Sequence, residues 1–140
     1  MAKNGYHITQ LSDLEKYSLL SWQDAGIHLG PEYAQMASNN PRYRETFDQS
    51  VQVKMLFLGR YQIVQMDAQI FDYYRAKVSQ TGAVDASQAV DRFALFGSSP
   101  NGFLFKNKEL RDKFNAQLKR LKQTGEYDKI FIRHTQAQAN

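Results

Sequence analysis

The chain contains no cysteine, and none of its apolar runs is long enough to cross a membrane. Without cysteine among its 140 residues, disulfide bonds and thiol catalysis are excluded, and the sequence suits oxidising and reducing compartments alike. A membrane-spanning helix needs about 20 consecutive apolar residues, and no such run occurs. The first six residues lack the apolar core of a signal peptide, so we expect this segment to carry no export signal.

Residue arrangements that carry catalysis or bind metals are also lacking. The histidines His7, His28 and His134 are too scattered to predict a metal site, and none has a nearby serine that suggests a catalytic triad. No recognisable pair of carboxylates supports general acid–base chemistry. The sequence therefore predicts a protein that is not an enzyme, with no catalytic residue, no metal and no cofactor.

The composition is that of one modest folded unit. With 42% hydrophobic and 13% aromatic residues, we expect a single domain over 1–140. The formal net charge is +4, but the 18 basic residues are spread along the chain and concentrate only on one face of a C-terminal helix. A charge-rich helix face is usually solvated, so we expect no nucleic-acid partner.

The first forty residues predict a helix, a strand and a second helix. We expect a short helix over 11–17 with Ser12 or Asp13 as its cap, followed by an apolar strand over 18–22. Pro31 must open or kink the helix that comes next, because proline lacks the N–H donor that an interior helical position needs.

The middle of the chain continues the alternation of strands and helices. On the helix expected over 49–59, Val51, Met55 and Leu58 share one apolar face. Val53, Leu56 and Phe57 widen this face, so we expect the helix to be buried on most sides. The further elements expected from the pattern are a strand over 61–66, a helix over 68–78, a loop over 81–87, and strands over 90–96 and 102–106.

The C-terminal region predicts an amphipathic helix followed by a second helix. Leu110, Phe114, Leu118 and Leu121 lie along one face, so we expect the first helix to dock through them. Asn107 is the expected N-cap, and Gly125 can adopt the left-handed conformation that ends the helix.

Strands separated by helices predict an α/β fold, with a three-layer arrangement in which helices cover both faces of a sheet with parallel strand pairs. Such sheets bind ligands beyond the carboxyl ends of their strands. Two places meet this rule. The first is the turn after the strand over 18–22, where the N–H groups at the start of a helix can hold an anion. The second is an aspartate after the strand over 61–66, which can accept hydrogen bonds from an ammonium group. The candidate ligand-binding residues are Trp22, Gln23, Asp24, Ala25, Gly26 and Asp67.

Structural roles compete with ligand binding at these positions. Asp24 and Asp67 are each as well placed to cap the following helix as to contact a ligand. Trp22 suits the core or the wall of a cleft, although stacking on a ligand is an alternative. The sequence leaves both interpretations open.

The C-terminal region also carries a resemblance to a known family. The pattern runs E-L-R-x-x-F-N-x-x-L-x-x-L-K-x-x-G-x-Y-x-x-I from Glu109 to Ile130. It is similar to the end of the type II periplasmic solute-binding proteins of ABC importers, the family 3 group that mostly binds polar amino acids. The ordered set of residues carries the resemblance.

The resemblance continues upstream over about residues 8–133. Residues 14–33 look like the entry to the second lobe of such a protein, and residues 40–74 look like its continuation. The latter stretch includes Asp67, which matches the aspartate that holds an amino-acid ammonium in many members. The sequence departs from the family at 23–25, where Gly-Thr/Ser-Thr/Ser is usual, and at Gln62, where aspartate is commoner.

The resemblance implies a fold and a function. It implies a type II periplasmic-binding-protein lobe in which about 8–95 form the second lobe and about 101–133 the C-terminal strand and helices, with the first lobe missing. It implies non-catalytic binding of a small polar solute, delivery to a membrane permease, and a periplasmic location. A sensor or regulatory domain with altered or lost ligand binding is the alternative, and a homodimer through the strand and helix at 102–121 would cover the apolar face that lacks a first lobe.

Overall fold

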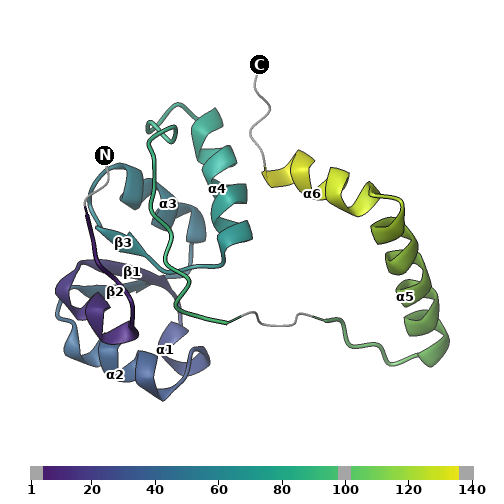
Figure 1. The fold of residues 1–140 in the computed structure, drawn as a ribbon, viewed down its shortest axis with the longest axis horizontal. Coiled ribbons are helices and arrows are strands. Elements are labelled where there is room, and N and C mark those ends of the chain that lie inside the picture. The colour runs from purple at the N-terminus through teal and green to yellow at the C-terminus, as the bar shows by residue number, and fades with distance from the viewer. Residues whose placement is uncertain (1–4, 98–101, 136–140) are drawn as a thin grey trace.

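The structure is a computed structural model that describes residues 5–97 and 102–135. Its centre is a three-stranded parallel sheet made of β1 (Leu19–Trp22), β2 (Tyr43–Thr46) and β3 (Ile63–Val64), in the order β2-β1-β3 (Figure 1). Leu19 is aligned with Tyr43 on one side and with Ile63 on the other. The chain therefore has the mixed α/β fold with a parallel sheet that the sequence predicts.

Helices cover both faces of this sheet. The 3₁₀ helix η1 (Leu11–Lys16) and helices α1 (Ala25–His28) and α2 (Pro31–Asn39) contribute to one apolar cluster, against which Ile63 packs. Helices α3 (Gln49–Phe57) and α4 (Ala68–Gln80) form a second cluster, against which Val64 packs. Because neighbouring strand residues point to opposite faces, the two clusters lie on opposite sides of the sheet.

The helix boundaries agree with the local signals in the sequence. Pro31 occupies the first turn of α2, where its missing N–H costs nothing. The Asn107 side chain accepts a hydrogen bond from the Leu110 N–H at 3.0 Å and so caps α5 (Lys108–Gln123). Gly125, with φ of 73°, separates α5 from α6 (Glu126–Thr135) as expected.

The C-terminal helices form, but α5 does not dock on the sheet. No residue of α5 is buried, and Leu110 and Leu121 are exposed. In Figure 1, α5 stands apart from the sheet and α6 returns beside α4. The expected docking face is instead partly covered by its own chain, because the rings of Phe103 and Phe105 each lie 5.1 Å from that of Phe114.

The strands differ most from the expectation. Within the described ranges, residues 90–96 and 102–106 form no strand, and β3 is shorter than the expected 61–66. The sequence analysis missed β2, none of whose residues is buried and whose polar side chains give little apolar signal. A strand depends on hydrogen bonds to a partner elsewhere in the chain, and a local pattern does not show whether that partner is present.

The burial of α3 agrees with the expectation that most of its sides are covered. No residue of Gln49–Phe57 is exposed, and Val53 and Phe57 of the predicted stripe are buried. The expectation fails at Leu58, which follows the helix and is exposed, and it did not include the fully buried Gln52.

Candidate functional site

The carboxyl edge of the sheet begins at Trp22, the last residue of β1. The N–H of Gln23 donates to the carbonyl of Thr46 at 3.0 Å, which holds the ends of β1 and β2 level. The partly buried Trp22 ring stacks on the His28 imidazole of α1, with ring centroids 5.4 Å apart and planes inclined by 27°. Trp22 therefore forms an aromatic wall at this edge.

The turn after Trp22 already contains a protein carboxylate. Asp24 has a left-handed backbone (φ of 62°), and its side chain makes no capping hydrogen bond to α1. Its N–H donates to Glu45 Oε2 at 2.9 Å, and Glu45 Oε1 accepts from the Tyr43 hydroxyl at 2.6 Å. Burial raises the pKa of Tyr43, and the bond to Glu45 adds to the increase, so the phenol keeps its proton. Glu45 thus stands where the sequence predicts a bound anion.

Ala25 and Gly26 have a packing role in this turn. Ala25 is completely buried in the first apolar cluster. A side chain added at Gly26 would contact Ala34 of α2 at 3.8 Å, which is an ordinary packing distance. Small residues here let α1 lie close to α2.

A buried chain of hydrogen bonds lies beneath this edge. The Tyr33 hydroxyl donates to Ser21 Oγ at 3.0 Å, and Ser21 Oγ donates to Gln65 Oε1 at 3.0 Å. Burial raises the pKa of Tyr33, which keeps its hydroxyl as a donor. The chain links α2, β1 and the end of β3. The sequence analysis missed these residues, and only the placement of polar side chains between apolar ones could have indicated them.

Asp67 follows β3 and caps α4. Its Oδ1 atom accepts hydrogen bonds from the N–H groups of Gln69 at 2.7 Å and Ile70 at 3.1 Å. The side chain is nevertheless exposed. Both roles that the sequence allows for Asp67 are therefore compatible with its position.

Asp67 also lines a cavity of about 540 Å³, which we call the α4–α6 cleft. The cleft lies where the first residues of α3 and α4 meet α6, because Gln49 and Asp67 line it together with residues of α6. Its wall combines one carboxylate, two amides, one imidazole and several aromatic rings, contributed by Gln49, Asp67, Gln69, Ile70, Tyr73, Tyr74, Tyr127, Ile130, Phe131 and His134. This composition suits a small ligand that carries a positive charge and some apolar surface.

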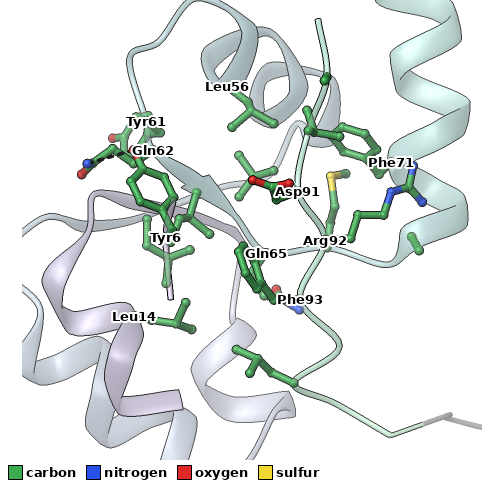
Figure 2. Close-up of a pocket in the computed structure, with 18 of the residues that line it drawn as sticks. Tyr6, Leu14, Leu56, Tyr61, Gln62, Gln65, Phe71, Asp91, Arg92 and Phe93 are labelled. Atoms are coloured by element: carbon green, nitrogen blue, oxygen red, sulfur yellow. Dashed lines mark hydrogen bonds between the residues drawn. The ribbon is translucent and has the colours of Figure 1, made fainter. Parts of the chain in front are cut away.

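A second cavity, of about 420 Å³, lies along β3, and we call it the β3 cavity (Figure 2). Figure 2 shows Asp91 and Phe93 on one side of it and Tyr6 and Tyr61 on the other. Residues 22–26 line neither cavity. The structure therefore places Asp67 in a cleft and leaves the other predicted site residues at the neighbouring edge of the sheet.

The described residues contain neither a metal-binding cluster nor a membrane-spanning helix. Within 5–97 and 102–135, no three histidine, cysteine, aspartate or glutamate side chains are grouped so that they could hold a metal ion. No helix in these ranges combines the length and the apolar character that crossing a membrane requires.

Comparison of the chain with protein-family models, with curated proteins and with solved structures found no match in any of the three.

Proposed function

We propose that this chain binds a small zwitterionic or cationic solute, such as a polar amino acid, without transforming it. The resemblance of about residues 8–133 to type II solute-binding proteins supports the proposal, and a parallel sheet with helices on both faces is compatible with a lobe of that type. In the transport version, the solute is collected in the periplasm and delivered to the membrane permease of an ABC importer.

The observation that carries the proposal is the position of Asp67 in the α4–α6 cleft. Both capping bonds in α4 go to Oδ1, and among the described residues none goes to Oδ2. An ammonium group can therefore bind Oδ2 without breaking the cap, in a charge-assisted hydrogen bond. The same carboxylate serves the helix and the ligand.

The aromatic rings of the cleft add attraction for a cation. Two of these rings already hold a lysine of the chain, since Lys77 Nζ lies 4.5 Å from the centre of the Tyr73 ring and Lys122 Nζ lies 5.3 Å from that of Tyr127. A ligand cation would have to displace these lysines or use the other rings. Tyr127 and Phe131 of α6 line the opposite side. Helix α6 thus borders the cleft beside the starts of α3 and α4, and it excludes part of the solvent from a ligand held at Asp67.

A sensor or regulatory domain is the second candidate, and Glu45 favours it. In the transport version, the N–H groups of the turn at 23–26 would receive the carboxylate of an amino acid. Glu45 occupies the Asp24 N–H instead. A domain that has lost or changed its ligand could keep such an internal carboxylate, which would fix the turn without a solute.

Calorimetry with a panel of cationic and zwitterionic amino acids tests the proposal. We expect binding in the millimolar range, because an open cleft does not enclose its ligand. Asp67→Asn should weaken binding by about tenfold or more, since a hydrogen bond to a charged group contributes about 1.5–3 kcal/mol.

Asp48→Asn is the matched control. Asp48 caps α3 by accepting from the Ser50 N–H at 2.8 Å, and it does not line the cleft. Asp48→Asn should lower the free energy of unfolding by about as much as Asp67→Asn does, and it should leave the affinity for the amino acid unchanged. Absence of binding across the panel, or equal loss of affinity in both variants, would contradict the proposal.

A further inference from the structure

The open edge of β3 has backbone groups without a partner strand. The N–H groups of Ile63 and Gln65 donate to the carbonyls of Ser18 and Leu20, each at 3.1 Å, so these residues face β1. Successive residues of a strand direct their backbone groups to opposite sides. The N–H and C=O of Val64 therefore face away from β1, and within the described ranges they have no hydrogen-bond partner.

A strap at Val90–Phe96 runs along the far side of the β3 cavity. It is anchored at both ends, since Val90 packs on the second apolar cluster and Leu95 on the first. Arg92 fixes its middle through a hydrogen bond from Nη1 to Asp72 Oδ2 at 3.2 Å. The strap passes the open edge of β3 without pairing with it, and the cavity lies between the two (Figure 2).

The cavity suits an extended apolar segment. Its walls include Leu56, Ile63, Val64, Phe71, Val90 and Phe93, and its volume of about 420 Å³ falls within the range of about 300–1,000 Å³ found for ligand pockets. The strap is itself short of backbone partners, because in the described chain its one backbone hydrogen bond runs from the Leu95 N–H to the Phe93 carbonyl. A strand placed in the cavity could form backbone hydrogen bonds with β3 on one side and with the strap on the other.

The same chain has a segment that fits this description. Residues 102–105 belong to no helix, pair with no strand of the described chain, and include the apolar Phe103, Leu104 and Phe105. Phe103 and Phe105 both lie against Phe114 of α5, whereas Leu104 between them is fully exposed. Because side chains alternate along an extended chain, Leu104 can enter a cavity while its two neighbours remain on α5.

We propose that residues 102–106 of a second copy of this chain insert as a strand into the β3 cavity, between β3 and the strap. The inserted backbone pairs with Val64, and Leu104 fills the apolar space. Charge supports the fit, because Lys106 ends the segment and Asp91 lies at the cavity wall, where the charge of the neighbouring Arg92 is paired with Asp72. Exchange of this segment between two copies gives a closed dimer that uses both segments and both cavities.

Light scattering of the full chain over a wide concentration range tests the association. We expect a dimer. Leu104→Lys should raise the dissociation constant of this dimer by about tenfold or more, because the variant no longer buries a leucine side chain in the β3 cavity. Leu104 is fully exposed in the single chain, so this change leaves the monomer fold intact. Ile27→Lys is the control, because Ile27 is also exposed but lies in α1, away from the cavity. A wild-type monomer at all concentrations, or a Leu104→Lys dimer as tight as wild type, would overturn the proposal.

Disulfide trapping locates the inserted segment. Because the chain has no native cysteine, every disulfide that forms must join the introduced cysteines. We expect Asp91→Cys and Leu104→Cys chains, mixed under mild oxidation, to form a disulfide-linked heterodimer, whereas Ile27→Cys mixed with Leu104→Cys should not. The double variant Asp91→Cys/Leu104→Cys distinguishes the alternative occupant. If it forms its disulfide within one chain at high dilution, the segment folds into its own cavity and the exchange is disproved.

Discussion

The side-chain amide of Gln52 bridges two strands by donating to the carbonyl of Gln65 at 3.0 Å and to the carbonyl of Leu20 at 2.9 Å. Gln52 is fully buried in α3, and its own Oε1 has no hydrogen-bond partner among the residues that the structure describes. The residue therefore ties the helix to β1 and to the end of β3, at the cost of one unsatisfied buried acceptor.

Replacing Gln52 tests the value of this bridge. We expect Gln52→Met to lower the free energy of unfolding by about 1–3 kcal/mol, because the partly buried Gln65 carbonyl loses its side-chain donor. Gln80→Met, at the exposed end of α4, is the control and should change stability by less than about 0.5 kcal/mol. Urea denaturation measures both. If Gln52→Met is as stable as wild type, the gain from removing the unsatisfied oxygen offsets the loss of the bridge.

Asn40 provides a second test, because it ends α2 with three hydrogen bonds. Its Nδ2 donates to the carbonyls of Leu14 and Tyr17 at 3.0 and 2.9 Å, and its Oδ1 accepts from the Arg42 N–H at 2.9 Å. Asn40→Ala should destabilise the fold by about 1–3 kcal/mol. The neighbouring Asn39 is exposed, and Asn39→Ala should have an effect below about 0.5 kcal/mol. Similar melting temperatures for the two variants would disprove this role of Asn40.

The stability of the fold should depend on pH through Asp13. Hydrogen bonds from Lys16 Nζ at 2.9 Å and from the Thr9 N–H at 3.0 Å hold the pKa of Asp13 well below its usual range. The unfolded chain therefore takes up this proton at a higher pH than the folded one, and the contribution to stability is lost as pH falls below about 4. Asp13→Asn should have a flatter dependence of unfolding free energy on pH in that window. Denaturation series for both proteins give the comparison, and parallel curves would exclude Asp13 as the source.

Gly30 tests the backbone between α1 and α2. Its φ of 95° lies in the region that favours glycine, although a Cβ there would meet no atom within 4 Å. Any loss of stability in Gly30→Ala would therefore come from backbone strain alone, and we expect about 1–2 kcal/mol. Gly97→Ala is the control, because that site is equally open and needs no positive φ, so it should be neutral or slightly stabilising. Thermal melts of the two variants measure this strain, and equal melting temperatures would exclude it.

The helices show how much local sequence determined. Pro31 at the start of α2, Asn107 at the start of α5 and Gly125 at the end of α5 all act as the sequence predicts. A cap or a glycine stop involves only residues a few positions apart, so its signal is complete within a short window. Asp67 was likewise identified from sequence as either a cap or a ligand contact, and its capping bonds are now evident.

The strands and the cavities were decided by tertiary structure. The sequence favours strands over 90–96 and 102–106, yet neither pairs, whereas the polar segment Tyr43–Thr46 pairs with β1. The chain Tyr33–Ser21–Gln65 and the meeting of Asp67 with α6 likewise join residues far apart in sequence. The physical reason is that a helix satisfies its backbone within its own residues, while a strand, a buried polar network and a cleft exist only where distant segments meet.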